Sequence, residues 1–415
     1  MAYQNPKGTA DYYPDEKSRF NQIADSFRKT SRKYGFKEVE SPAFESFSLL
    51  KEKEGEEIKE QIFTLEKRGN EKLGLRFDLT VPITRMFITK QRELPKPVKW
   101  FYCTRMWRYE QPQKGRLREF YQYGVELFGS DKLAADAEVI RLAIDSLLDL
   151  GLTKDDFFVK LNNRDLTEGF IEGLGIKKVA DIMRLVDKRG KIGNNAFLEE
   201  LEKYAIEPEV IEKIQEFLEI TDITQLKNLN EKAQKALEEL NKLMELLEDK
   251  REFIKIDVET VRGLAYYTGS VFEIFDTEEK YRALCGGGRY DNLVELFGGQ
   301  PTSATGFGIG FSILELLLGE KMKLPEPQLE VDYYIAPIAE NTVLDAQKLA
   351  NSLREKSFSV EIDLMQRSLS KQLDYANTIK AKNVVFVGED EIKEKKFKVK
   401  NMESGQEEKL SIEDF

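Results

Sequence analysis

The chain has 415 residues, 64 of them basic and 75 acidic, and its net charge of −11 excludes a non-specific nucleic-acid coat. It contains no histidine, which excludes Ser-His-Asp and Cys-His catalysis and histidine-ligated zinc. Its two cysteines, Cys103 and Cys285, exclude a cysteine-rich zinc site and fit a reducing compartment. Residues 1–17 are polar and charged, and no run approaches about 18 apolar residues, so we expect a cytoplasmic protein without a membrane span.

Changes in composition predict the domain organisation. Residues 1–165 mix aromatic, strand-like runs with amphipathic helices, and residues from about 166 to 250 place apolar side chains at helical spacing in a Lys/Glu-rich background. Strand and glycine character returns at 253–311, and the Pro-rich segment 324–327 indicates a linker. We expect one domain over 1–325 with a helical insertion, and a small α/β domain over 326–415 where strands and helices alternate.

Asp78 and Thr80 stand two residues apart in the segment 76–80. On a strand, side chains at this spacing share a face. The pair could hold an amine, although an exposed surface strand explains the spacing equally well.

The segment 85–118 is basic within an acidic protein. It contains ten basic residues and only two acidic ones, and aromatic residues are interleaved with them in the sequence. A solvated face is the usual meaning of a charge run. Because these charges lie among strand-like aromatic residues and Arg presents a forked donor to phosphate oxygens, the segment favours a phosphate-handling site.

Residues 100–110 and 119–128 predict two paired strands joined by the loop 111–116. Arg108 and Glu110 would share one face, and so would Gln122, Gly124 and Glu126. Such a floor offers a cation to phosphate or carboxylate and anions to a basic ligand group. The alternative is an exposed hairpin face with a salt bridge.

Two later segments are rich in glycine. Residues 285–291 (CGGGRYD) follow the segment 261–273, and residues 306–310 (GFGIG) precede an apolar helix. Consecutive glycines allow close approach of a ligand, or form a bulge or tight turn. The second segment fits neither the dinucleotide fingerprint nor the P-loop, and close packing of a strand on a helix also explains it.

These segments together resemble the histidyl-tRNA synthetases, which are class II aminoacyl-tRNA synthetases. Residues 34–45 (YGFKEVESPAFE) resemble motif 1, and residues 108–122 (RYEQPQKGRLREFYQ) resemble motif 2 with its loop. Residues 262–267 (RGLAYY) and 287–291 (GGRYD) resemble the two histidine-specific signatures, and residues 367–391 resemble the C-terminal anticodon-binding domain. The likeness covers nearly the whole chain in order.

The resemblance implies an α+β fold with a class II antiparallel sheet flanked by helices. It implies a catalytic domain over 1–325 whose insertion at about 166–250 reaches toward the tRNA acceptor arm, and an α/β anticodon-binding domain over 326–415. The implied reaction activates histidine with ATP and transfers it to the 3′ end of tRNA-His. Mg²⁺ would accompany ATP, although no motif fixes a metal site. Motif 1 implies a homodimer.

The resemblance also implies roles for individual residues. Arg108 would contact the α-phosphate of ATP, and Glu110 would lie near the adenine. Arg116, in the same loop, is our own candidate for a further ATP-binding residue. Arg262 would stabilise the α-phosphate as the histidine carboxylate attacks, so Arg262 and Arg108 are the implied catalytic residues.

Histidine would be bound by a second group of residues. Asp78 and Thr80 would take its α-amino group, and Gln122 would contact its backbone. Its imidazole would lie between Glu126 and Tyr267, because its two nitrogens need two polar partners. The implied histidine-binding residues are Asp78, Thr80, Gln122, Glu126, Arg262, Tyr266, Tyr267 and Tyr290.

Two positions depart from the family pattern. Ala265 replaces an aspartate of the first signature, which is tolerable because Arg262 and Tyr267 remain. Ile313 stands where motif 3 carries the arginine that binds the ATP γ-phosphate. Either another cation such as Arg116 substitutes, or ATP binding is weakened, or the chain is a histidine-sensing regulatory paralog. The C-terminal domain, with Arg108 and Glu110, favours the enzyme.

Overall fold

The computed structural model describes residues 3–52, 60–66, 71–204, 206–262, 266–328 and 331–415. Its larger unit comprises the described residues up to Asp11 and from Phe20 to Pro325, and its smaller unit comprises Tyr12–Arg19 and the described residues from Glu326 onward. Within these segments, no helix has both the length and the apolar character needed to cross a bilayer.

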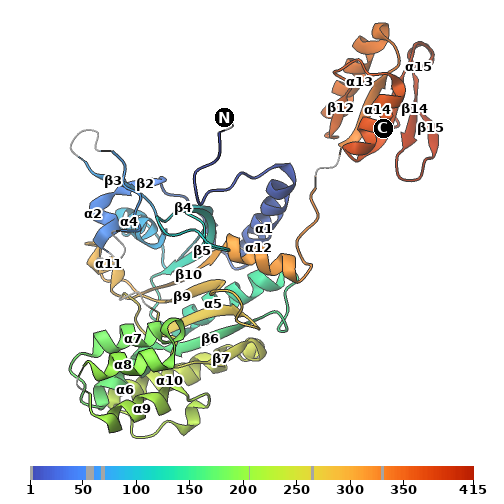
Figure 1. Cartoon of the computed structure of the whole chain (residues 1–415). Coiled ribbons are helices and arrows are strands. Elements are labelled where there is room, and N and C mark those ends of the chain that lie inside the picture. Colours follow the sequence, from blue (N-terminus) through green and yellow to red (C-terminus); the bar gives the residue numbers. More distant parts are fainter. Residues whose placement is uncertain (1–2, 53–59, 67–70, 205, 263–265, 329–330) are drawn as a thin grey trace. The chain divides into compact units, whose positions relative to one another are not determined.

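The larger unit is built on a sheet whose eight described strands run in the order β1-β4-β5-β10-β9-β8-β6-β7 (Figure 1). The pairs are antiparallel except β1 with β4 and β6 with β7, at the two edges. A separate antiparallel pair joins β2 (Phe44–Ser46) to β3 (Leu73–Leu75). The bounds of the large sheet are β1 (Lys37–Glu38), β4 (Val98–Trp107), β5 (Glu119–Phe128), β6 (Phe157–Asn163), β7 (Ile254–Ile256), β8 (Ser270–Asp276), β9 (Cys285–Arg289) and β10 (Ala304–Gly310). This confirms the predicted antiparallel sheet.

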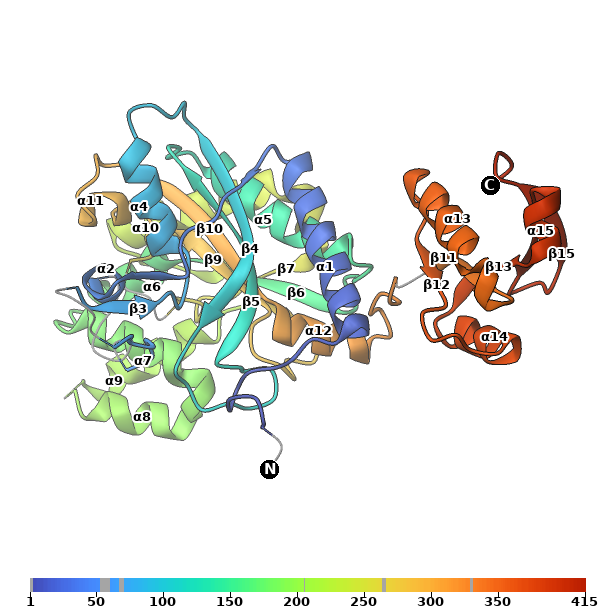
Figure 2. The same cartoon turned by 90° about the horizontal axis from the view of Figure 1, so that it is seen from above.

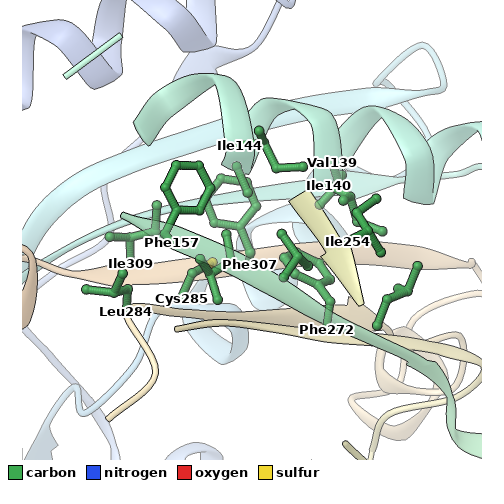
Figure 3. Packing of buried hydrophobic residues seen from close by; sticks show 14 of the residues in the cluster. Val139, Ile140, Ile144, Phe157, Ile254, Phe272, Leu284, Cys285, Phe307 and Ile309 are labelled. Carbon is green, nitrogen blue, oxygen red and sulfur yellow. The ribbon is translucent and has the colours of Figure 1, made fainter. Parts of the chain in front are cut away.

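One face of this sheet carries the main hydrophobic core. Figure 3 shows α5 (Leu133–Leu148) packing its aliphatic side chains against Phe157, Phe272 and Phe307 of the sheet. Phe27 of α1 (Pro14–Lys33) stacks on Tyr123 of β5 with ring centroids 4.4 Å apart. The remaining helices of this unit outside the insertion are α2 (Phe47–Glu52), α4 (Thr80–Lys90), α11 (Leu293–Leu296) and α12 (Phe311–Glu320). Figure 2 shows α4 and α1 on either side of β4 and β5.

Strand alternation separates this core from the opposite face. On β5, Tyr123, Val125 and Leu127 are buried in the core, so Gln122, Gly124 and Glu126 project from the other face. The register places Gly308 opposite Gly124, and Gly306 opposite Glu126. The second face is therefore polar and lined with glycine.

Helices fill the interval in which the sequence predicts an insertion. Phe170 and Phe217 stack at 3.9 Å between ring centroids and join two of these helices in one apolar cluster. The helices are α6 (Arg164–Gly173), α7 (Val179–Ile192), α8 (Asn194–Glu202), α9 (Pro208–Leu218) and α10 (Glu231–Leu246), with short 3-10 turns at Ile223–Gln225 and Glu248–Phe253.

The smaller unit has its own sheet, in the order β12-β11-β13-β14-β15. β11 pairs in parallel with β12 and β13, and β14 and β15 add antiparallel strands. The bounds are β11 (Val331–Pro337), α13 (Val343–Glu355), β12 (Val360–Ile362), α14 (Leu369–Thr378), β13 (Ala381–Val387), α15 (Glu389–Glu394), β14 (Lys396–Asn401) and β15 (Glu407–Ser411), with a 3-10 turn at Glu340–Thr342. The predicted C-terminal α/β fold is confirmed.

A buried ion pair fixes β9 to α5. Arg289 donates to Asp136 through Nε and Nη2, and also bonds the Ser130 and Lys132 carbonyls. The two side chains are 8% and 1% exposed. Removing one partner leaves a buried charge without compensation. We therefore expect Arg289→Met to lower the free energy of unfolding by about 3–5 kcal/mol, measured by urea denaturation.

The matched control removes both charges. Asp136→Leu combined with Arg289→Met should recover much of the lost stability, because no unpaired charge then remains. A single Arg289→Met variant as stable as the wild type would show that the pair does not hold the strand.

Candidate active site

The polar face of the large sheet forms the floor of a cavity of about 210 Å³. Its walls come from the segment before α4, the β4–β5 hairpin, the segments before β8 and β9, and the start of α12. Every predicted site residue lines it: Asp78, Thr80, Arg108, Glu110, Arg116, Gln122, Glu126, Arg262, Tyr266, Tyr267 and Tyr290. Residues spread over more than 200 positions of sequence thus meet in one place.

Glycines in the sheet make room for three functional side chains. A Cβ atom on Gly286 would lie 2.1 Å from Nη1 of Arg262, and one on Gly308 would lie 2.0 Å from Nε2 of Gln122. A Cβ on Gly306 would lie 2.4 Å from Oε2 of Glu126. A side chain at any of these positions would displace the functional group above it, so the glycines keep these groups in place within regular strands. This explains both glycine-rich segments better than a bulge does.

One end of the cavity is lined by carboxylates and tyrosines. Glu126 is 1% exposed, and a Cβ on Gly306 would also lie 3.0 Å from the Tyr290 hydroxyl, so the two groups converge. The Tyr290 hydroxyl is buried without a hydrogen-bond partner among the described residues. Burial, with the nearby charges of Glu126 and Asp78, raises the pKa of Tyr102 above its ordinary value. This end therefore suits a polar ligand that can donate hydrogen bonds to the carboxylates.

The Arg262 side chain lies over Gly286 of β9 and makes contacts with several residues around it. Its Nη1 pairs with Glu273, its guanidinium carbon lies 5.6 Å from the centre of the Tyr267 ring, and Arg164 hydrogen-bonds its carbonyl. Burial opposes its charge, but Tyr267 and Glu273 outweigh that effect and raise its pKa. Its Nε is buried without a partner among the described residues. Arg262 is thus a fixed cation with a donor to spare.

Arginines cluster at the other end of the cavity. Arg108 donates Nε to the Phe77 carbonyl at 3.0 Å, and its guanidinium lies 5.2 Å from the Phe120 ring centre. Arg116 pairs with Glu110. Although burial alone would raise the pKa of Glu110, the hydrogen bond from Arg116 and the surrounding arginine charges lower it. This end attracts an anion such as a phosphate chain.

Two local predictions were wrong. β4 ends at Trp107, so Arg108 and Glu110 lie in the loop, whose backbone turns as Tyr109 bonds the Gln61 carbonyl. Asp78 is not on a strand either, because β3 ends at Leu75 and α4 begins at Thr80. Both pairs nevertheless line the cavity. Ala265 lies outside the described residues.

Sequence reasoning missed Tyr102 and Arg282, which also line the cavity. Tyr102 accepts a hydrogen bond from Gln122 at 3.4 Å. Its position on the Gln122 face followed from the hairpin pairing and could have been predicted. Arg282 belongs to no recognisable motif, and no sequence signal separates it from a surface arginine.

The glycine beneath Arg262 provides a test of this geometry. Gly286→Ala should displace the guanidinium, since the nearest atoms to the added methyl all belong to Arg262. We expect the variant to reproduce much of the kinetic defect of Arg262→Ala although the arginine is still present. Steady-state kinetics of both variants make the comparison. Full activity of Gly286→Ala would contradict the packing described here.

Comparisons with known proteins agree with this geometry. The family model for histidyl-tRNA synthetase matches residues 8–314, and the model for an anticodon binding domain matches residues 332–415. Histidine–tRNA ligases of Haloarcula marismortui and Pyrococcus furiosus are each 38% identical, covering 100% and 99% of this chain and 97% and 96% of their own lengths. The crystal structure of histidyl-tRNA synthetase from Nostoc sp. PCC 7120 is similar with a TM-score of 0.83 and 25% identity, over 99% of this chain and 97% of that one.

An antiparallel sheet with a polar, glycine-lined cavity, combined with a domain of the anticodon-binding type, defines an aminoacyl-tRNA synthetase of class II. The two family models match nearly the whole described chain, and the curated relatives share its full length. The chain belongs to the histidyl-tRNA synthetase family.

Proposed function

We propose that this chain activates histidine with ATP to histidyl-adenylate and transfers the histidyl group to the 3′ end of tRNA-His. The observation that carries the proposal is the order of groups along the sheet. Glu126 lies over Gly306, Gln122 and Arg262 lie over Gly308 and Gly286, and the arginines lie beyond the strand ends. A basic amino acid bound near Glu126 and a polyphosphate bound near the arginines would therefore meet close to Gln122 and Arg262.

The acidic end supports the choice of amino acid. Glu126 would accept a hydrogen bond from the imidazole, and Tyr267 and Tyr290 would enclose the ring. Asp78 and Thr80 would hold the α-amino group, while the Gln122 amide would orient the backbone. Histidine would then present its carboxylate toward Arg262.

The arginine end supports the activation step. A carboxylate oxygen of histidine attacks the α-phosphorus of ATP, the bond to the bridging oxygen breaks, and pyrophosphate leaves with that electron pair. Arg108 and Arg262 would stabilise the charge that develops on the α-phosphate. No proton has to be transferred in this step, so a chain without histidine can carry it out.

Mg²⁺ bound together with ATP would supply positive charge that offsets the charge of the phosphates. Among the described residues, no group of three or more Asp, Glu or Cys side chains is placed to hold a metal ion. At the arginine end, the carboxylate of Glu110 is already paired with Arg116. The ion would therefore depend mainly on the phosphates of the nucleotide for its ligands.

The motif 1 segment is anchored by the buried Arg76, which donates to the Ser41 and Pro42 carbonyls. A rigid segment of this kind suits a two-fold contact, so we propose a homodimer that works in the cytoplasm. Light scattering of the purified protein tests the dimer.

A histidine-sensing regulatory paralog is not favoured. The curated relatives that match the whole chain are named ligases, and the anticodon binding domain model matches residues 332–415. The test is transfer of labelled histidine to a tRNA-His transcript, with a tRNA of another anticodon and acceptor end as control. We expect charging of the first alone. Histidine binding without charging of either tRNA would support the regulatory function instead.

A further inference from the structure

We propose that Arg282 is the cation that binds the terminal phosphates of ATP, in place of the arginine that motif 3 lacks at position 313. Arg282 and Ile313 line the same cavity. The inference rests on the proposed use of ATP and assigns a residue to one part of that site.

Position 313 itself has an apolar role. Ile313 is 7% exposed, and its Cγ1 lies 3.2 Å from where a Cβ on Gly115 would stand. Gly115 adopts a φ of +75° at the turn of the motif 2 loop. Ile313 therefore packs against the motif 2 loop at Gly115. The charge that the phosphates require must come from another element.

The backbone brings residue 282 to the same place. β9 pairs with β10 so that Cys285 faces Ile309, and the next residue, Gly310, donates its N–H to the Leu284 carbonyl at 3.3 Å. The chain that enters β9 therefore passes the first turn of α12. Arg282 lies two residues before Leu284, and Ile313 lies three residues after Gly310. The side chain of Arg282 can thus bind a phosphate in the part of the cavity that Ile313 also lines.

The charge of Arg282 has no ion-pair partner among the described residues, unlike the charges of Arg116 and Arg262 in the same cavity. Arg116 pairs with Glu110, and Arg262 pairs with Glu273. Arg282 makes no hydrogen bond or ion pair with any described residue. Although part of the Arg282 residue is exposed, desolvation of its charge and repulsion from Arg116 and Arg108 lower its pKa, with Glu110 opposing them. A bound anion would relieve this repulsion, because it adds the missing negative charge.

The exposure of Arg282 suits a residue that binds the phosphates released as pyrophosphate. Arg282 is an exposed residue at the cavity, whereas Arg262 is deeply enclosed. The β- and γ-phosphates depart as pyrophosphate, so their cation should stand at the opening. AMP lacks both groups and would not reach Arg282.

Comparing the binding of ATP and AMP therefore tests the role of Arg282. We expect Arg282→Ala to weaken ATP binding about 10- to 100-fold, the loss typical of a hydrogen-bonded charge, while AMP binding stays at the wild-type value. Arg282→Lys keeps the charge and should recover part of the ATP affinity. Calorimetric titration with ATP and with AMP, without histidine, measures both.

Arg184→Ala and Arg116→Ala serve as comparisons for Arg282→Ala. Arg184→Ala, on α7 and outside the cavity, is the matched control and should bind both nucleotides normally. If Arg116→Ala selectively weakens ATP and Arg282→Ala does not, the assignment of Arg282 is overturned. Equal losses of ATP and AMP in Arg282→Ala would also overturn it. Failure of the proposed function is distinct, since it would appear as a wild type without histidine-dependent exchange.

Discussion

Replacing Arg262 by alanine is expected to slow histidine-dependent adenylation by about two to three orders of magnitude. Its guanidinium is held by Glu273 and Tyr267, so it can stabilise transition-state charge with little reorganisation. Because this charge develops mainly in the transition state, the effect should fall on kcat, with histidine affinity largely preserved. Pyrophosphate exchange and histidine titration measure the two quantities.

Arg262→Lys is the informative companion to this variant. Lysine keeps the charge but not the forked donor, so only partial activity should return. Near-normal exchange in Arg262→Ala would remove this residue from the mechanism. A large loss of histidine affinity would instead assign it a binding role.

Replacing Glu126 by glutamine is expected to raise the histidine KM by about two orders of magnitude, while the ATP KM changes little. Glu126 is buried beside Tyr290 and Tyr102, and glutamine has the same shape without the charge. The loss corresponds to removing one partner of a buried, charge-assisted hydrogen bond, at about 2–5 kcal/mol. Steady-state exchange with each substrate varied in turn measures both constants.

A position on the same strand supplies the control for Glu126. Glu119→Gln, on β5 outside the cavity, should leave both constants unchanged. Equal losses for histidine and ATP in Glu126→Gln would indicate a structural role for the carboxylate. Melting temperatures of the two variants separate misfolding from a specific binding defect.

Much of the site could be predicted because strand pairing is local. The motif 2 hairpin follows from aromatic alternation, and β5 begins and ends at the predicted residues, Glu119 and Phe128. That pairing alone puts Gln122 and Glu126 on one face. The approach of Arg262 and Tyr290 to that face required the family resemblance, because more than 130 residues separate them from β5 in the sequence.

The rest depended on long-range geometry. The glycines are explained only once Gly286 is known to lie beneath Arg262 and Gly308 beneath Gln122. Arg289 stands within a histidine-specific signature, yet its side chain binds Asp136 and does not line the cavity. The position of Arg282 follows from the register of β9 with β10, which sequence patterns do not define.

Histidine-dependent ATP–pyrophosphate exchange on the purified wild-type chain shows directly whether the chain activates histidine. It reports formation of the adenylate and requires neither tRNA nor the smaller unit's recognition of it. We expect exchange that depends on Mg²⁺, is supported by histidine, and is absent with arginine or glutamine in place of histidine. Histidine binding without any exchange would contradict the proposal that this chain activates its amino acid.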